Sequence, residues 1–168
     1  MSSQLKAFKR DTGKWGLRNH VLILPLHSAL SATARAIADG SDGAVAISHD
    51  WSGEIDNDLP RIIFTFSGYA ANPNNFAVVF LTIGSDSENE IIAGAQALGL
   101  KNFTNLALPE IGSMEGLRVK AIEVANHTDF GGLGRPDRKI NTRSTVLYGG
   151  MSPEVAVCRT AHSTPHRL

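Results

Sequence analysis

The chain has 168 residues, of which 42% are hydrophobic and 19% are charged, and its formal net charge is zero. This length suffices for one hydrophobic core and is short for two, and the composition is that of a globular protein. No apolar run approaches the roughly 20 residues of a membrane span, and the basic N-terminus lacks the apolar region of a signal peptide. We therefore expect a cytoplasmic protein without membrane contact, in which the single Cys158 forms no internal disulfide.

Charge is distributed unevenly along the chain. From Arg135 to the C-terminus there are six Lys or Arg and two Asp or Glu, a net charge of +4, which leaves −4 in the rest. The basic residues are scattered among Pro, Gly, Ser and Thr without aromatic interleaving, which is not the pattern of a nucleic-acid-binding surface. We expect no nucleic-acid partner.

Strand-like and helix-like segments alternate from the first apolar run onward. Residues 21–26 form an unbroken apolar run, which predicts a strand buried on both faces. Residues 31–39 are rich in alanine and stop at Gly40, which predicts a helix. Residues 43–48 predict a second strand. Residues 59–71 carry apolar side chains at helical spacing before an Asn-Pro terminator, and so predict a second helix.

The same alternation continues through residue 126. Residues 77–83 predict a third strand, and Ser85 with Glu88 matches a capping box that predicts a helix over 86–98. Residues 103–108 predict the fourth strand, and a fourth helix runs from 113 or 114 to 126. Four such alternations are typical of a three-layer, Rossmann-like α/β domain with a mostly parallel sheet of about four strands.

Beyond residue 126 this pattern ends. Residues 131–136 are rich in Gly, and the later apolar segments are confined to 145–148 and 155–158. Residues 159–168 are polar and basic without periodicity, which predicts disorder. We therefore divide the chain into an α/β domain over 1–130 and a linker-like, irregular or non-native tail over 131–168.

Polar side chains follow each predicted strand. The carboxyl ends of parallel strands meet at one edge of the sheet, where ligands of open α/β folds bind. The sequence therefore predicts a site at this edge with two imidazoles, three carboxylates and several hydroxyls. Its members, in chain order, are His27, Ser28, His49, Asp50, Ser52, Ser85, Asp86 and Glu110.

Four sequence landmarks, in order, resemble the altronate and galactarate dehydratases and, with a different leaving group, the large subunit of sulfolactate sulfo-lyases. The resemblance covers about the first 125 residues. The landmarks are Gly16-Leu17-Arg18-Asn19 before the first strand, Ser48-His49-Asp50-Trp51-Ser52-Gly53 after the second, Gly68-Tyr69-Ala70-Ala71-Asn72-Pro73-Asn74 at the end of the second helix, and Ile83-Gly84-Ser85-Asp86 after the third strand.

The resemblance implies metal-assisted dehydration of a sugar acid to a 2-keto-3-deoxy acid. Such a reaction needs a base, a cation or donor array for the enediolate, and an acid for the leaving hydroxyl. By position in the family, His49 and Asp86 are the expected catalytic residues and ligands of a divalent metal, Fe²⁺ or Mn²⁺. Arg18, with Asn19, is expected to bind the substrate carboxylate, as the planar guanidinium suits. His27, Ser52 and Ser85 complete the expected substrate-binding set.

Each of these residues also has a structural interpretation. His49 can bond a neighbouring loop carbonyl, a carboxylate such as Asp86 is expected in the first turn of any helix, and Arg18 can form a salt bridge in its turn. The family carries cysteines where this chain has Ser52 and Ser85, and a serine is neither a thiolate nor a soft metal ligand. The loop after His49 is one residue shorter than in the family.

The family's second half, with its Cys-Gly-Gly-Ser-Asp motif, is not recognisable in this chain, which indicates a truncated or frame-altered reading of a longer gene. One alternative is therefore a catalytically inactive α/β domain that only binds or acts as a scaffold, and another is a sulfolactate sulfo-lyase subunit. A separate small subunit or the missing C-terminal half is an expected partner, and exposed apolar surface predicts homo-oligomers. No glycine-rich phosphate-binding motif is present, so no nucleotide is expected.

Overall fold

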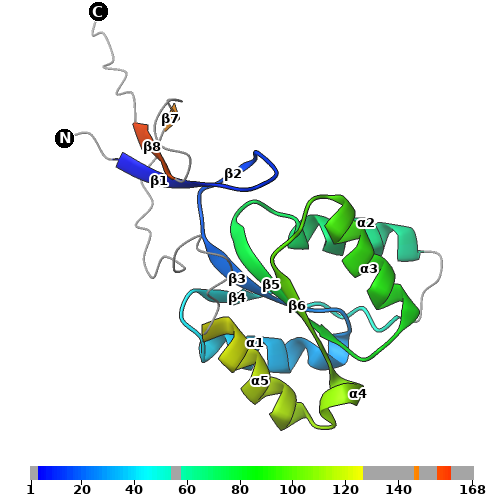
Figure 1. The fold of residues 1–168 in the computed structure, drawn as a ribbon. Helices are drawn as coiled ribbons and strands as arrows, with labels where there is room; N and C mark the ends of the chain where they lie inside the picture. The colour runs from blue at the N-terminus through cyan, green and yellow to red at the C-terminus, as the bar shows by residue number, and fades with distance from the viewer. Residues whose placement is uncertain (1–3, 54–57, 127–145, 148–154, 160–168) are drawn as a thin grey trace, which may run out of the picture.

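The computed structural model describes residues 4–53, 58–126, 146–147 and 155–159 (Figure 1). Its centre is a parallel sheet of four strands in the order β4-β3-β5-β6. The strand order reverses between β3 and β5, the two central strands. The strands are β3 (His20–Pro25), β4 (Ala44–Ala46), β5 (Asn75–Thr82) and β6 (Phe103–Ala107).

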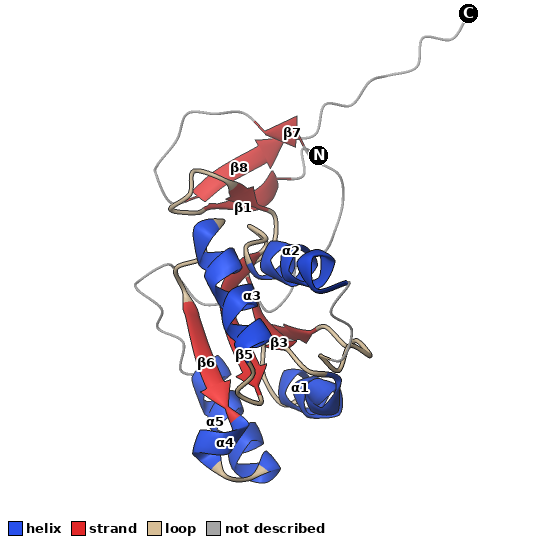
Figure 2. Cartoon of the chain, turned by 90° about the vertical axis from the view of Figure 1, so that its right-hand side faces the viewer, coloured by secondary structure: helices blue, strands red, loops and turns tan. Residues whose placement is uncertain are grey.

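Helices cover both faces of this sheet. One face carries α1 and α5, and the other carries α2 and α3, which gives three layers (Figures 1 and 2). This arrangement confirms the expected α/β fold class. The helical segments are η1 (Ser28–Leu30), α1 (Ser31–Asp39), α2 (Leu59–Ala70), α3 (Asp86–Ala97), α4 (Leu108–Ile111) and α5 (Met114–Asn126).

The apolar run of β3 supplies both halves of the core. Val21 and Ile23 pack toward the α1 and α5 side, whereas Leu22 and Leu24 pack toward the α2 and α3 side, because successive side chains of a strand point to opposite faces. All four are buried. The absence of polar alternation in the sequence thus reflects a strand with a helix layer on each side.

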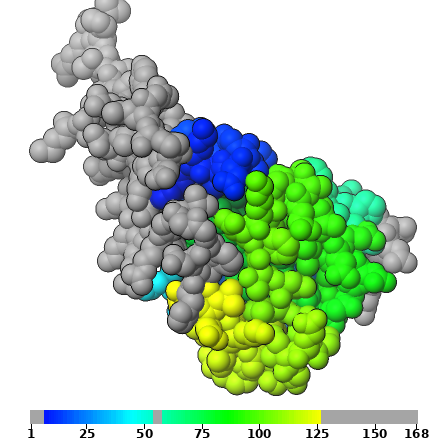
Figure 3. All heavy atoms as spheres, in the orientation of Figure 1, coloured from blue at the N-terminus to red at the C-terminus, as the bar shows by residue number. Residues whose placement is uncertain are grey.

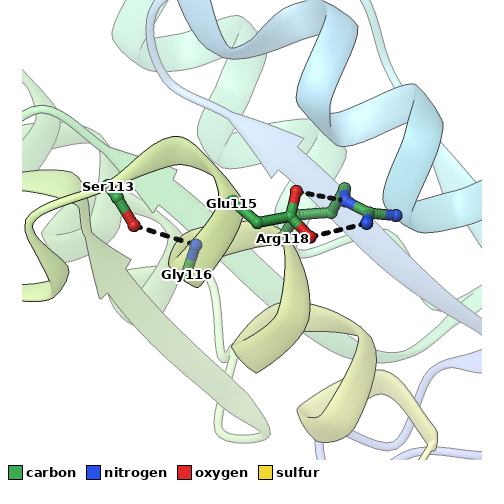
Figure 4. A network of polar contacts seen from close by, with 4 residues as sticks. All are labelled: Ser113, Glu115, Gly116 and Arg118. Atoms are coloured by element: carbon green, nitrogen blue, oxygen red, sulfur yellow. Dashed lines mark hydrogen bonds and ion pairs between the residues drawn. The ribbon is translucent and has the colours of Figure 1, made fainter.

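The four strands and four helices expected over residues 21–126 are all present, with boundaries that differ by at most two residues. The first turn of α5 shows how local sequence sets such a boundary. Gly116 donates its backbone N–H to Ser113 Oγ, and Arg118 binds both carboxylate oxygens of Glu115 at 2.7 and 3.0 Å (Figure 4). This hydrogen-bonded ion pair lowers the pKa of Glu115.

A second sheet was not expected from the sequence. It is antiparallel, in the order β2-β1-β8-β7, and joins the N-terminal segment to strands from the C-terminal tail. Of the tail expected over 131–168, residues 131–145, 148–154 and 160–168 lie outside the described residues, and the division at residue 130 stays a prediction. Arg159, expected to begin a disordered end, instead lies in β8. The strands of this second sheet are β1 (Gln4–Lys9), β2 (Trp15–Gly16), β7 (Val146–Leu147) and β8 (Val155–Arg159).

No helix in the described ranges combines the length and the apolar character that crossing a bilayer requires.

Candidate functional site

The loops after β3, β4 and β5 meet at the carboxyl edge of the sheet, as expected for parallel strands. Ser28 donates its backbone N–H to Trp51 O at 2.8 Å, and Ser31 Oγ donates to His49 O at 3.0 Å, so the first two loops are bonded to each other. The third loop enters beside them because β5 pairs with β3. We call this surface the carboxyl rim; it carries His27, His49, Ser52, Ser85 and Asp86.

His49 uses both of its ring nitrogens within the protein. Nε2 lies 2.8 Å from Pro25 O, and the backbone N–H of Trp51 donates to Nδ1 at 3.2 Å. Because a carbonyl only accepts hydrogen bonds, this pairing assigns the proton to Nε2 and a neutral ring. The ring also packs against Phe66 of α2, with centroids 4.6 Å apart. In this conformation His49 joins the end of β3 to the loop after β4.

The second imidazole of the rim, His27, forms a hydrogen bond to the described residues at only one ring nitrogen. His27 Nδ1 accepts the backbone N–H of Ala29 at 3.1 Å and thereby caps η1. The proton of the neutral ring is then on Nε2, which makes no hydrogen bond to any residue that the structure describes. His27 is half-buried and can donate Nε2–H to a ligand oxygen.

Trp51 is a rim residue that sequence analysis missed. Its indole Nε1 is buried, and no hydrogen-bond partner for it lies among the described residues. A buried tryptophan N–H normally finds a partner, so a residue outside the described ranges can supply one, or a ligand that reaches the indole after the loop moves. The signal in the sequence was an aromatic residue in the loop that follows a strand, among the polar residues of the predicted site.

The turn from β5 into α3 contains its own carboxylate. Glu88 is 1% exposed, and its carboxylate accepts the backbone N–H groups of Ile83, Gly84 and Ser85 at 2.8 to 3.1 Å. These amides would otherwise be a natural anion site. Asp86, by contrast, is exposed in the first turn of α3. The predicted carboxylate therefore faces solvent at the rim.

Arg18 and Asn19 lie at the other end of the sheet, since both precede β3. Six residues of strand separate them from the rim, a span of roughly 20 Å. Asn19 is buried, and its Oδ1 accepts from Arg10 Nη1 at 2.8 Å. The backbone N–H of Arg18 donates to Asn74 Oδ1 at 3.1 Å, so the Gly-x-Arg-Asn and Asn-Pro-Asn landmarks contact each other. One small acid cannot touch these residues and the rim of the same chain together.

The rim residues do not by themselves fit a divalent metal. Within the described ranges, no three His, Cys, Asp or Glu side chains form a group that could hold an ion. Both nitrogens of His49 are engaged, and Ser52 and Ser85 are poor ligands in place of thiolates. The expected Fe²⁺ or Mn²⁺ stays a prediction, and further ligands would have to come from outside the described residues.

The family model described as D-galactarate dehydratase/altronate hydrolase, second domain, matches residues 7–128, which include the whole parallel sheet and its helices. The chain belongs to this second-domain family. Both names in the description are those of enzymes that act on sugar acids. The residues that carry the rim and those that carry Arg18 and Asn19 all lie inside the matched range.

A curated relative of this second-domain chain is the (2R)-sulfolactate sulfo-lyase subunit beta of Chromohalobacter salexigens. It is 32% identical over 93 residues, which cover 55% of this chain. The match spans 24% of the length of that relative. No solved structure matches the chain.

Proposed function

We propose that the chain is a domain of a sugar-acid lyase that removes water from an altronate- or galactarate-type acid to give a 2-keto-3-deoxy acid. The observation that carries this proposal is the family match over residues 7–128, which coincides with the complete parallel sheet. Because the chain spans about a quarter of its curated relative, residues or subunits beyond it are proposed to complete the active site.

The rim offers donors that suit a hydroxy acid. His27 Nε2–H, the buried indole N–H of Trp51 and the half-buried hydroxyl of Ser52 lie in adjacent loops. In the proposed complex they bind the hydroxyl and carboxylate oxygens of the substrate. Donors placed in this way stabilise the negative charge that grows on the carboxylate as the neighbouring proton leaves.

Asp86 is the proposed base. In the elimination, the base takes the proton from the carbon next to the carboxylate, and the electrons pass into the new carbon–carbon double bond. The hydroxyl on the next carbon departs as water with a proton from solvent, and the base later returns its own proton to solvent. The resulting enol becomes the 2-keto acid. The exposed position of Asp86 leaves its carboxylate accessible to a substrate bound by the neighbouring loops.

The role proposed for His49 is conditional on a rearrangement. To act as a base or a metal ligand, Nδ1 would have to give up the N–H of Trp51, or Nε2 the carbonyl of Pro25. Without that change His49 positions the two loops that carry His27 and Ser52. A metal, if bound with ligands from elsewhere, would supply the cationic stabilisation of the enediolate.

Two other functions have specific support. The engagement of both His49 nitrogens and the serines at the family's cysteine positions favour a domain that binds an acid without converting it. The 32% identity to a sulfo-lyase subunit favours the same elimination with sulfite rather than hydroxide leaving. Homo-oligomers and a separate small subunit stay proposals.

The test is an assay of the purified chain, alone and together with the residues or subunits proposed to complete the site, with altronate, galactarate and sulfolactate, each with and without Fe²⁺ or Mn²⁺. Turnover is expected in the completed assembly. The proposal expects formation of a 2-keto-3-deoxy acid, and loss of most of that activity in Asp86→Asn with the fold retained. Sulfite release alone would assign the sulfo-lyase reaction. A folded chain that binds acids without turnover would establish the binding domain, and one that neither binds nor converts any of them would end the proposal.

A further inference from the structure

A cavity of about 60 Å³ lies at the amino edge of the sheet, far from the carboxyl rim. This volume corresponds to about two water molecules, or to one carboxylate group. Its walls come from the turn after β1, the C-terminal ends of α2 and α3, and the start of β5. In Figure 3 the atoms of the N-terminal hairpin lie directly against those of the central part of the chain.

Arg10 is the main cation of this cavity. Its Nε donates to Pro73 O at 2.7 Å, Nη1 to Asn19 Oδ1 at 2.8 Å and Nη2 to Arg18 O at 3.0 Å. These three bonds use three of the five N–H donors of a guanidinium and leave one on each terminal nitrogen. All three acceptors are neutral, and no carboxylate of the described residues pairs with Arg10. Partial burial lowers the pKa of Arg10, because it removes part of the water around the charge.

Apart from Arg10, the charged residues of the lining are one lysine and one aspartate, whose charges cancel. Lys101 and Asp11 both line the cavity and lie 3.9 Å apart, each more than half exposed. With Arg10, the lining therefore carries two positive charges and one negative, a net charge of +1. This excess matches one carboxylate.

Helix C-termini normally repel an anion, but here their carbonyls are occupied. Asn75 Nδ2 donates to Tyr69 O at 2.7 Å and to Ala70 O at 3.3 Å at the end of α2. At the end of α3 the backbone N–H of Leu100 donates to Ala95 O at 3.0 Å. Hydrogen bonds within the protein thus partly neutralise the negative ends of both helices.

We propose that this amino-edge cavity binds the carboxylate of a small organic acid through Arg10 and Lys101. Apolar walls from Ala70, Phe76 and Leu100 suit the carbon atoms of such an acid better than a fully hydrated phosphate. The site goes beyond the proposed lyase reaction, because the carboxyl rim lies at the opposite end of the strands. It gives Arg10, rather than Arg18, the carboxylate-binding role at this edge.

Titration of the ¹⁵N-labelled chain by NMR, with acetate, phosphate or chloride at equal ionic strength, tests the site. The result expected is a saturable shift of the Arg10 Nε–H signal and of the amides of 11, 12 and 99–102 with acetate, and no comparable shift with chloride. Equal shifts with chloride, or none with acetate, would overturn the proposal. Tighter binding of phosphate than of acetate would overturn the assignment to a carboxylate.

Substitutions at two exposed residues of the lining should change the affinity for acetate in opposite directions. Neither substitution removes a buried group. Lys101→Ala should weaken acetate binding about two- to fivefold, the range of an exposed charge pair, whereas Asp11→Asn should strengthen it. Lys120→Ala, on the exposed surface of α5, is the matched control and should bind as the wild type does. Identical affinities in Lys101→Ala and Asp11→Asn would refute the charge argument. Signals of the carboxyl rim are read separately, so a failure here is distinct from a failure of the lyase proposal.

Discussion

Two histidines at the same edge of the sheet differ in what they leave open to a ligand. His49 has a hydrogen bond at each ring nitrogen and an aromatic ring at its face, whereas His27 has one internal bond. Residue type and strand order predicted that both imidazoles lie at the carboxyl edge of the sheet, where the structure has them. The bonds that distinguish them depend on the conformations of three loops, which no local pattern specifies.

The first residue-scale prediction concerns the bonds of His49. His49→Ala removes a donor to Pro25 O, an acceptor for the Trp51 N–H and a contact with Phe66, so it should lower the free energy of unfolding by about 2 to 3 kcal/mol. His27→Ala, which loses one partly exposed bond, is the matched control and should lose about 1 kcal/mol or less. Urea denaturation measures both. Equal losses would show that the His49 ring does not hold the loops together.

The indole of Trp51 gives a second prediction at this scale. If its buried N–H binds substrate oxygen, Trp51→Phe should weaken altronate binding about five- to tenfold while the fold is kept, since one hydrogen bond is lost. Trp15→Phe, in β2 at the other end of the molecule, should leave the affinity unchanged. Calorimetric titration measures both affinities, and equal affinity in the two variants would remove Trp51 from the site.

A third prediction concerns pH and His20. Burial, reinforced by the charge of Arg18 and opposed by a hydrogen bond to the backbone of Gly43, lowers the pKa of His20. The unfolded chain then binds more protons below about pH 6.5, so stability present above that pH is lost as the pH falls through the folded pKa. His20→Gln should lose less stability than the wild type between about pH 7.5 and about pH 5.5. Parallel losses in denaturation curves would contradict the sign.

At the scale of elements, α2 and α3 approach each other closely at one point. Ser67 Oγ donates to Ile91 O at 2.9 Å across the helix pair, and a Cβ added at Gly94 would lie 2.5 Å from Ser67 Oγ. Gly94 thus permits a close contact between α2 and α3, and any larger residue there would push the two helices apart. Gly68, also within a helix, faces open space.

These two helical glycines predict opposite effects of the same substitution. Gly94→Ala should destabilise the fold by about 1 to 3 kcal/mol, because the methyl group overpacks the α2–α3 contact. Gly68→Ala should stabilise it by about 0.5 to 1 kcal/mol through higher helix propensity. Thermal denaturation of both variants checks the pair. A stabilising Gly94→Ala would mean that the helices are not in close contact there.

Which elements could be predicted follows from how local their signals are. The central strands are unbroken apolar runs and α3 begins with a capping box, so each is recognisable within about ten residues of sequence. The second sheet could not be predicted in this way. In it β1 pairs with β8, about 150 residues later, and the short segment Gln4–Lys9 mixes polar and apolar residues with little strand signal of its own.

At the scale of the whole molecule, the residues expected to form one site lie at two ends of the sheet. His27, His49, Ser52, Ser85 and Asp86 follow strands, whereas Arg18 and Asn19 precede one. Connectivity alone predicted the first group. The second was chosen by family position, and the strand between the two groups separates them by roughly 20 Å.

We propose one ligand-binding edge at each end of the strands. The carboxyl rim combines donors that are unpaired among the described residues with an exposed carboxylate, which fits the elimination proposed for this chain. The amino edge combines Arg10 and Lys101 around a small cavity, which fits a carboxylate. We propose that a sugar acid binds at the carboxyl rim.

The most direct test maps altronate onto the ¹⁵N-labelled chain by chemical-shift perturbation. We predict saturable shifts for the amides of the three rim loops, residues 27–31, 49–53 and 84–87, whether or not signals at the amino edge also move. If saturating altronate leaves all three loops unperturbed, whether or not signals at the amino edge shift, a sugar acid does not bind at the carboxyl rim.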